Sequence, residues 1–236
     1  MIEVRNLSFA YRHEMVLRDV SFVVSPGETV SIVGANGTGK TTLLRVLATL
    51  AVPVSGTVMV DGQNALDDPF RYRKHVGYLP EQVALYDDMT VKEYLKYRAT
   101  LKGEPSRRVR RRVSEAVDMC QIGDVLRAQI RSLSAGMRKR VALADALLLR
   151  PRVLLLDDFL AGLDFEMRRA AGEILSNAAA FSSVIITGHE LWDFAGWTTR
   201  FLVLSGGVIA SKFETAGLDQ ETLRDRVESA LRGGAR

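Results

Sequence analysis

The stretch that decides the fold reads Gly34-Ala35-Asn36-Gly37-Thr38-Gly39-Lys40-Thr41-Thr42. It matches, without a mismatch, the pattern of a phosphate-binding loop: a glycine, four variable residues and then Gly-Lys-Thr. Glycines allow successive backbone N–H groups to face a phosphate, and a helix that begins there directs the positive end of its dipole to the same point. We expect Lys40 to contact the terminal phosphates and the Thr41 hydroxyl to bind Mg²⁺. The nucleotide contacts predicted in this loop are Gly34, Asn36, Gly37, Thr38, Gly39, Lys40, Thr41 and Thr42.

The residues on both sides supply the structural context that this loop needs. Thr29 to Val33 follow the turn residues Ser25-Pro26-Gly27 and form an apolar, strand-like run, while Leu43, Leu47 and Leu50 recur at helical spacing. A strand that leads into the loop and a helix that leaves it argue against a chance match. By itself the loop indicates only a nucleoside triphosphatase.

Further strand-like and helical patterns surround this unit. Residues 2–4 and 20–24 read as short strands, and residues 56–62, bracketed by glycines, as a β segment at a sheet edge. From Val91 to Leu149 apolar residues recur at helical spacing with one break at 102–105, which indicates an inserted helical subdomain.

The second half of the chain reads as a βαβ unit. Val153–Leu156 and Val184–Ile186 are continuous apolar runs, typical of parallel strands buried on both faces, and a helix is predicted between them at 165–179. A hairpin is predicted at 201–210 and a terminal helix at 219–231. The sequence therefore predicts an α/β fold: a P-loop NTPase core with a parallel sheet, an N-terminal antiparallel β subdomain and an inserted helical subdomain. We assign residues 1–81 and 150–215 to the core with the β subdomain, 82–149 to the helical subdomain and 216–236 to a C-terminal helix.

The composition is that of a globular protein, with 47% hydrophobic and 25% charged residues in a chain of 236. The longest apolar runs fall far short of the roughly 18 residues that span a bilayer. The start, Met1 to Arg5, lacks the succession of a signal peptide, so we expect a cytoplasmic protein. Cys120 is the single cysteine, which precludes an intrachain disulfide.

The net charge of +4 is concentrated in one segment after Pro105. We interpret this run as the solvated face of a helix, balanced by acids such as Glu115. No aromatic side chains are interleaved with it, so a stacking platform for single-stranded nucleic acid is missing and nucleic acid is not an expected partner. The run consists of Arg107, Arg108, Arg110, Arg111 and Arg112.

Segments after the loop resemble the motifs of ABC (ATP-binding cassette) ATPases, in the order typical of that family. Leu133-Ser134-Ala135-Gly136-Met137 resembles the signature motif. Leu154 to Asp158 resembles the Walker B strand, and Ala161 to Asp164 resembles the D-loop. With the phosphate loop, these motifs extend the resemblance over most of the chain.

Three single residues also resemble family motifs, and each has a plainer alternative. Gln82 is similar to the Q-loop glutamine, although a loop amide needs no function. His189 is similar to the switch histidine, although a lone histidine is more often a satisfied core residue. Tyr11 is similar to the aromatic residue that stacks on adenine, with Phe9 as its competitor and core packing as the alternative.

The resemblance implies two copies that pair head to tail with ATP between them. The phosphate loop of one copy and the signature motif of the other would hold the nucleotide. The further nucleotide-binding residues that it implies are Tyr11, Gln82, Ser134, Gly136 and Asp164. The metal ligands that it implies for Mg²⁺ are Thr41, Gln82 and Asp157, and the catalytic residues are Asp158, His189 and Lys40. Independently of the family, Ser134 is placed to cap a helix that begins near Met137, and a buried Asp157 without a partner would be costly.

The chain departs from the family pattern next to the Walker B aspartate. Asp158 stands where the family usually has a glutamate that polarises the attacking water. Its side chain is shorter by one methylene, about 1.5 Å of reach, so we expect hydrolysis to be slow. Ala135, Met137 and Phe159 are further departures, and they leave open a heterodimer in which a partner ATPase supplies a standard site.

The function implied by the resemblance is that of a transporter's ATPase subunit, held at the inner face of the cell membrane by a separate permease. The segment from Tyr86 to Leu95 resembles exporter-type ATPases. A stand-alone soluble ABC ATPase and an ATP-sensing regulatory subunit with negligible turnover are the alternatives. Dimers of either kind, homomeric or heteromeric, remain open at this point.

Overall fold

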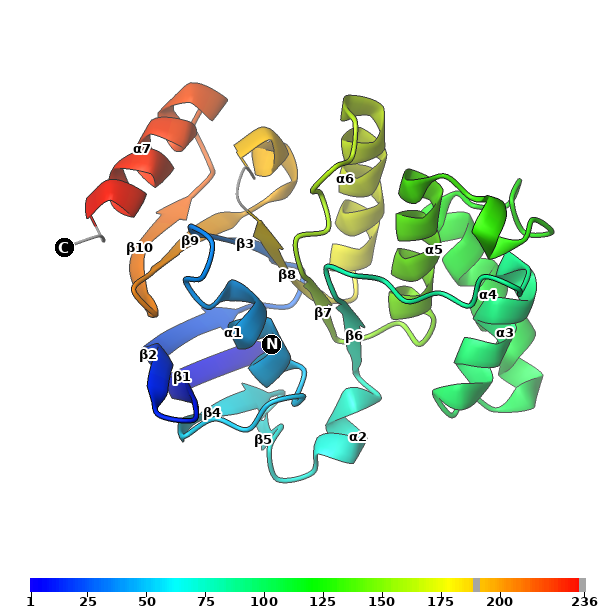
Figure 1. The fold of residues 1–236 in the computed structure, drawn as a ribbon, viewed down its shortest axis with the longest axis horizontal. Coiled ribbons are helices and arrows are strands. Elements are labelled where there is room, and N and C mark those ends of the chain that lie inside the picture. The colour runs from blue at the N-terminus through cyan, green and yellow to red at the C-terminus, as the bar shows by residue number, and fades with distance from the viewer. Residues whose placement is uncertain (189–191, 234–236) are drawn as a thin grey trace.

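A six-stranded sheet forms the centre of the computed structural model, which describes residues 1–188 and 192–233. Its order is β10-β9-β3-β8-β7-β6, and only β10 runs antiparallel to its neighbour (Figure 1). The predicted parallel core is therefore confirmed. The strands span Thr29–Val33 (β3), Val76–Leu79 (β6), Val153–Leu156 (β7), Ser183–Gly188 (β8), Arg200–Ser205 (β9) and Val208–Glu214 (β10).

Helices and a second sheet cover the two faces of this central sheet. Because successive side chains of a strand point to opposite faces, Val153 and Leu155 of β7 pack with α1, whereas Leu154 and Leu156 pack with α5 and α6. This explains why β7 reads as one unbroken apolar run. The helices are α1 (Lys40–Leu47), α5 (Ala135–Leu147), α6 (Phe165–Ala179) and α7 (Gln220–Gly233), and the short η2 spans Trp192–Trp197.

The second sheet is antiparallel, with the order β2-β1-β4-β5. β1 (Ile2–Tyr11) and β2 (Glu14–Val24) form a long hairpin, and β4 (Ser55–Val60) and β5 (Gln63–Asn64) complete the sheet. The sequence predicted this sheet but only residues 2–4 and 20–24 of the hairpin, which lie beside each other at its open end. Register shifts along β1 interrupt its alternation, which hid the part of both strands nearer the turn.

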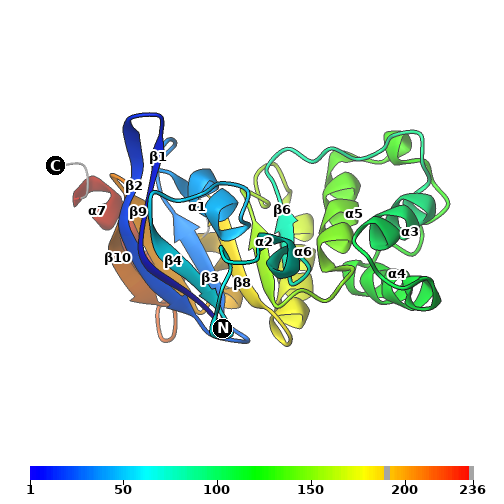
Figure 2. The ribbon, with the colours of Figure 1, turned by 90° about the horizontal axis from the view of Figure 1, so that it is seen from below.

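The helical subdomain lies beyond β6, at the opposite end of the molecule from α7 (Figure 2). It contains α3 (Val91–Leu101), α4 (Ser106–Cys120) and the amino-terminal part of α5, with the short η1 (Ile130–Ser132) between α4 and α5. Thr90 caps α3 in a reciprocal capping box with Glu93. The small α2 (Pro69–Arg73) precedes β6.

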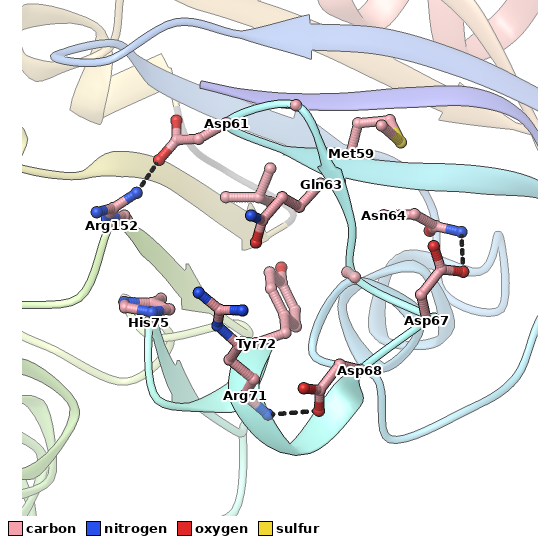
Figure 3. A pocket seen from close by; sticks show the side chains of 13 residues that line it. Met59, Asp61, Gln63, Asn64, Asp67, Asp68, Arg71, Tyr72, His75 and Arg152 are labelled. Atoms are coloured by element: carbon pink, nitrogen blue, oxygen red, sulfur yellow. Dashed lines mark hydrogen bonds and ion pairs between the residues drawn. The ribbon is translucent and has the colours of Figure 1, made fainter.

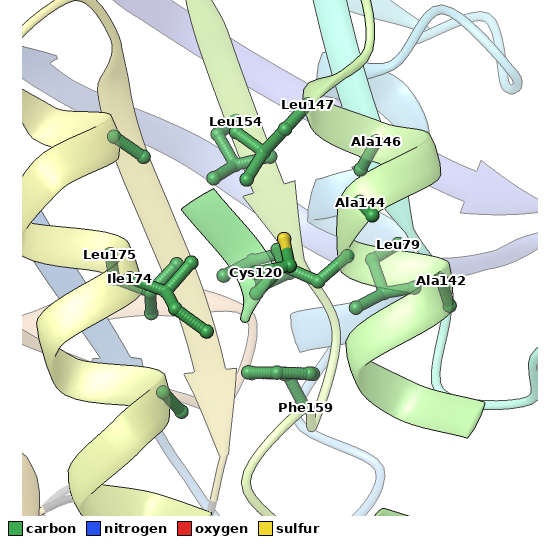
Figure 4. Packing of buried hydrophobic residues seen from close by; sticks show 14 of the residues in the cluster. Leu79, Cys120, Ala142, Ala144, Ala146, Leu147, Leu154, Phe159, Ile174 and Leu175 are labelled. Atoms are coloured by element: carbon green, nitrogen blue, oxygen red, sulfur yellow. The ribbon is translucent and has the colours of Figure 1, made fainter. Parts of the chain in front are cut away.

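The apolar core continues from the central sheet into the helical subdomain without a break. Figure 4 shows Cys120 of α4 beside residues from α5, α6 and β7. Phe159 lies at the same junction and is 2% exposed. Its ring therefore fills the core between α5 and α6, which accounts for the apolar residue after Asp158. The boundaries at 82 and 149 stay a prediction, because packing does not mark them.

The arginine run lies on the solvent face of α4, as the sequence predicts, except for Arg112, which is half-buried. Val109, Val113 and Val117 are buried on the opposite face, and Arg112 forms ion pairs with Glu104 and Glu115. Among the residues that the structure describes, no helix is long and apolar enough to cross a membrane.

Candidate nucleotide site

The phosphate loop connects the end of β3 to the start of α1, as the glycine motif predicts. Gly39 immediately precedes α1 with φ of 103°, a left-handed conformation that favours glycine. A side chain at Gly34 would meet the Leu204 carbonyl oxygen at 2.4 Å, so this close approach of two backbones also needs glycine. The loop therefore presents the amino-terminal end of α1, and its free N–H groups, to the cavity beside it.

Lys40 is held over its own loop and is only 9% exposed. Its Nζ donates hydrogen bonds to the carbonyl oxygens of Gly34 (2.7 Å) and Ala35 (2.9 Å). Burial lowers the pKa of Lys40, and the charges of Asp158, Asp157 and Glu81 oppose that shift. A cation thus stands where a phosphate would meet the loop.

Asp157 follows β7 and is 2% exposed. Its Oδ1 accepts hydrogen bonds from Thr187 Oγ1 at 2.7 Å and from Thr41 Oγ1 at 3.2 Å. Its Oδ2 is buried and has no hydrogen-bond partner in the part of the chain that the structure describes. A buried carboxylate oxygen without a partner is costly, so this atom indicates a missing ligand.

This arrangement fits Mg²⁺. Mg²⁺ takes oxygen ligands and usually binds one or two protein groups together with substrate phosphates and waters. Thr41 and Asp157 offer a hydroxyl and a carboxylate beside the phosphate loop. The described residues contain no cluster of three or more acidic, histidine or cysteine ligands.

A cavity of about 320 Å³ brings the phosphate loop and the carboxylates together. Half-buried Asp158 contributes from the carboxyl end of β7, and Glu81 contributes from the segment after β6. In α/β proteins, ligands bind at this edge of a parallel sheet. The cavity is lined by Tyr11, Val16, Asn36, Gly37, Gly39, Lys40, Thr41, Thr42, Glu81, Asp157 and Asp158.

Known proteins are similar to this chain in sequence and in fold. A model of the ABC transporter family matches residues 17–161. The chain belongs to the ABC transporter ATP-binding family. It is 32% identical to YxlF of Bacillus subtilis, an uncharacterised ABC transporter ATP-binding protein. The match spans 221 residues, which are 94% of this chain and 73% of YxlF.

Two further comparisons support the family and the fold. PotA of Haemophilus influenzae, a spermidine/putrescine import ATP-binding protein, is 30% identical over 213 residues, which cover 89% of this chain but only 57% of PotA. A solved ATP-binding subunit of an ABC transporter matches with a TM-score of 0.84 and 27% identity, over 97% of this chain and 99% of that one.

In this ABC cassette Tyr11, and not Phe9, lines the cavity. Tyr11 is 46% exposed, whereas Phe9 is 6% exposed and packs in the core of the β subdomain. Their rings meet edge to face, with centroids 4.8 Å apart. A hydrogen bond with Thr42 lowers the pKa of Tyr11 and ties the phenol to α1. Tyr11 is therefore the residue with a ring available for stacking.

Gln82 does not line the cavity of the cassette, whereas the preceding residue, Glu81, does. Gln82 is exposed on the bend that follows β6. The sequence pointed to Gln82 because its amide resembles the Q-loop residue, and it missed Glu81. A signal was present: Leu79 pairs with Leu156, so Glu81 and Asp158 each lie two residues past paired strand ends.

The signature motif lies outside the cavity of the same chain. Ser134 caps α5, because its Oγ accepts a hydrogen bond from the Met137 N–H at 3.3 Å. A side chain at Gly136 would lie 2.4 Å from Met167 Cε, so α5 packs closely on α6 there. The predicted cap is confirmed, and one cassette does not bring Ser134 or Gly136 to its own phosphate loop.

The D-loop aspartate also stands apart from the cavity lining. Asp164 caps α6 by accepting a hydrogen bond from the Met167 N–H at 2.8 Å, and it is exposed. Thr38 and Gly34, two predicted nucleotide contacts in the phosphate loop, are not among the residues that line the cavity. Thr38 Oγ1 donates a hydrogen bond to the Ala35 carbonyl at 2.9 Å, within the loop itself. His189 lies outside the described residues.

A larger cavity, of about 570 Å³, lies at the opposite edge of the central sheet. Figure 3 shows it between β4, β5 and α2, with His75 and Arg152 at the amino ends of β6 and β7. Its carboxylates already have partners: Arg152 donates to Asp61, and Asn64 donates to Asp67. Its size therefore does not make it the nucleotide site.

Proposed function

We propose that this chain is the ATP-binding and ATP-hydrolysing subunit of a transporter and acts on a separate membrane permease. The observation that supports it best is the unpartnered Oδ2 of Asp157 beside Thr41, at the mouth of a phosphate loop that already holds the Lys40 ammonium. A metal-bound nucleotide would satisfy this carboxylate and provide the anion that the loop is built to bind.

The residues of the cavity have different roles in the proposed hydrolysis. Thr41 and Asp157 would hold Mg²⁺, which neutralises phosphate charge when bound. Lys40 exchanges its two carbonyl partners for phosphate oxygens. Asp158 accepts a hydrogen bond from the attacking water, and Tyr11 stacks on the base. The slow turnover that we infer follows from the short reach of Asp158.

A second copy or a related cassette is needed to complete the site. Ser134 and Gly136 lie at the amino-terminal end of α5, where free N–H groups favour an anion, yet they do not line the cavity of their own chain. A facing subunit would bring this helix end to the terminal phosphate. Both homodimers and heterodimers meet this requirement.

The permease and the direction of transport are parts of the proposal that rest on family resemblance. PotA is named for import, and this chain spans 57% of its length. The exporter-type assignment, which rests on the segment from Tyr86 to Leu95, stays a prediction. The same holds for a location at the inner face of the membrane, where the permease would hold the chain.

Nucleotide binding by the full-length chain tests the proposal. A fluorescent ATP analogue with Mg²⁺ should bind, and Lys40→Ala should weaken its binding about tenfold or more, a loss of about 1.4 kcal/mol. Lys96→Ala is the matched control, because Lys96 is an exposed lysine of α3. Equal affinity in wild type and Lys40→Ala, or no binding at all, would contradict the nucleotide site.

Purification from detergent-solubilised membranes tests the transport role. A multi-spanning membrane protein that copurifies with the chain supports the transporter subunit. A chain that hydrolyses ATP but is recovered only by itself supports the stand-alone ATPase. Tight ATP binding without single-turnover hydrolysis supports the regulatory sensor.

A further inference from the structure

Glu81 and Asp158 occupy equivalent positions on two neighbouring strands. β6 and β7 run parallel with Leu79 paired to Leu156, and each acidic residue follows its paired leucine by two positions. The Asp157 N–H also donates to the Leu79 carbonyl at 2.9 Å, which fixes the two strand ends against each other. Both side chains line the nucleotide cavity.

Two lysines, Lys40 and Lys139, lie in the electric field of both Glu81 and Asp158. Burial lowers the pKa of Lys40 and of Lys139, and in each case the negative charges of Asp158 and Glu81 oppose the shift. Glu81 is thus close enough to influence the lysine that would contact the terminal phosphate. Glu81 is exposed on the bend that follows β6 and lines the cavity, so a ligand in the cavity can reach it.

Asp157 points independently to a ligand at this place. Its side chain is 2% exposed and lines the cavity, and its Oδ2 lacks a partner among the described residues. In the proposed site Asp157 would hold Mg²⁺ together with Thr41. Two carboxylates of the cavity, Glu81 and Asp158, therefore remain for the attacking water.

Glu81 carries a longer side chain than Asp158 at the same cavity. The backbone of Asp158 is held by a hydrogen bond from its N–H to Thr187 Oγ1 (3.2 Å) and has φ of 45°. Its short side chain starts from this fixed point. The Glu81 side chain is longer by one methylene, about 1.5 Å, and it starts from an exposed bend on the neighbouring strand.

We propose that Glu81 is a catalytic carboxylate that, in the assembled site, accepts the proton of the attacking water opposite Asp158. The water oxygen forms a bond to the γ-phosphorus, the bond from the γ-phosphorus to the bridging oxygen of ADP breaks, and the proton passes to the Glu81 carboxylate. The products are ADP and inorganic phosphate. The inference rests on the proposed ATPase function, and it makes Asp158 the residue that orients the water.

Isosteric variants of the full-length chain test this role. Glu81→Gln keeps the side-chain shape but cannot take a proton. The rate constant of single-turnover hydrolysis should therefore fall about 100-fold or more, within the range for loss of a general base. Affinity for the fluorescent ATP analogue with Mg²⁺ should stay the same or rise, because a negative charge near the γ-phosphate is removed. Glu214→Gln, the same change at an exposed position of β10, is the control.

Three outcomes would overturn the inference while leaving the ATPase intact. These are wild-type kcat in Glu81→Gln, a tenfold loss of Mg²⁺-nucleotide affinity with the single-turnover rate preserved, or a loss of hydrolysis in Gln82→Ala that exceeds the loss in Glu81→Gln. If the wild-type chain itself neither binds nor hydrolyses ATP, the proposed function fails and not merely the role of Glu81.

Discussion

Lys139 of α5 donates a hydrogen bond from Nζ to the Phe159 carbonyl at 2.9 Å and a second one to the Ala161 carbonyl. Those two carbonyls belong to the segment that follows Asp158 and leads to the D-loop. Lys139 therefore ties the helix of the signature motif to the loop that follows Asp158. The signature motif ends at Met137, so the family resemblance gave no reason to select this lysine.

Replacement of Lys139 should disturb catalysis more than binding. Lys139→Met removes both hydrogen bonds, so Asp158 loses a fixed position, and we expect kcat to fall about tenfold, less than the ~100-fold that a misplacement of 1 Å can cost. KM for ATP should change less than threefold. Lys139→Arg, which can still donate to both carbonyls, should restore part of the rate. An equal loss in kcat and in affinity would indicate a general structural role instead.

Asp158→Glu should raise turnover and lower stability at once. The added methylene brings the carboxylate toward the water, so single-turnover hydrolysis should be faster than in wild type. However, φ at this position is 45°, where Asp and Asn are tolerated better than Glu. The backbone should cost about 1 kcal/mol, equivalent to a fall in Tm of about 2–4 °C for a chain of this size. Turnover equal to or below wild type would refute the account of slow hydrolysis.

Thr187→Val should remove the shorter of the two hydrogen bonds that Asp157 accepts. The 2.7 Å hydrogen bond to Asp157 Oδ1 is lost, as is the 3.2 Å bond that the Asp158 N–H donates to Thr187 Oγ1, and Thr41 remains as the weaker partner of Asp157. We expect a destabilisation of about 1–3 kcal/mol in urea unfolding without Mg²⁺, and a smaller one with Mg²⁺ and ATP, because the metal satisfies the carboxylate. Thr100→Val, on the exposed side of α3, serves as the control. The same loss with and without metal would argue against Mg²⁺ at Asp157.

Gly136→Ala separates packing from phosphate contact. The new methyl group lies 2.4 Å from Met167 Cε, the flexible end of its side chain, so we expect a modest loss of stability of about 1 kcal/mol. In the Met167→Ala background the steric clash is absent, so Gly136→Ala should no longer lower the free energy of unfolding there. If ATP-dependent dimerisation, measured by light scattering, is still impaired in the double variant, Gly136 contacts the nucleotide. Full recovery of both properties would leave only a packing role.

Gly172→Ala should be more destabilising than Gly136→Ala. A methyl group there would lie 2.3 Å from the ring of Trp197, which is larger and less flexible than a methionine end. Overpacking of this kind costs about 1–3 kcal/mol, and the indole should move, with a shift of tryptophan fluorescence. Gly123→Ala, where a methyl group meets open space, is the control. Unchanged stability in Gly172→Ala would contradict the close contact of α6 with Trp197.

The sequence predicted the elements that follow one clear period. The helix expected at 165–179 has those bounds, and the apolar runs at 153–156 and 184–186 are neighbouring parallel strands. The phosphate loop, with Lys40 and Thr41, was identified because its chemistry requires fixed residue types at fixed spacing. The part of the β1–β2 hairpin nearer the turn was not predicted, since bulges break its alternation.

The site residues beyond the loop depended on geometry that no local pattern contains. Whether Glu81 or Gln82 faces the cavity is decided by the bend after Pro80. Glu81 lines the cavity, whereas the role of Gln82 stays a prediction. Trp197 had no explanation in the sequence, because its partner Gly172 is distant along the chain and lacks a side chain. The register of β6 against β7 is the one clue that would have identified Glu81.

The two carbonyl bonds of Lys40 have a thermodynamic consequence. Because the ammonium is already satisfied by Gly34 and Ala35, the phosphate loop is preorganised before any nucleotide arrives, and its ordering entropy is lost during folding. Each monomer should therefore dock ATP with a small heat-capacity change. The larger calorimetric signal should appear only when two cassettes associate and bury apolar surface between them.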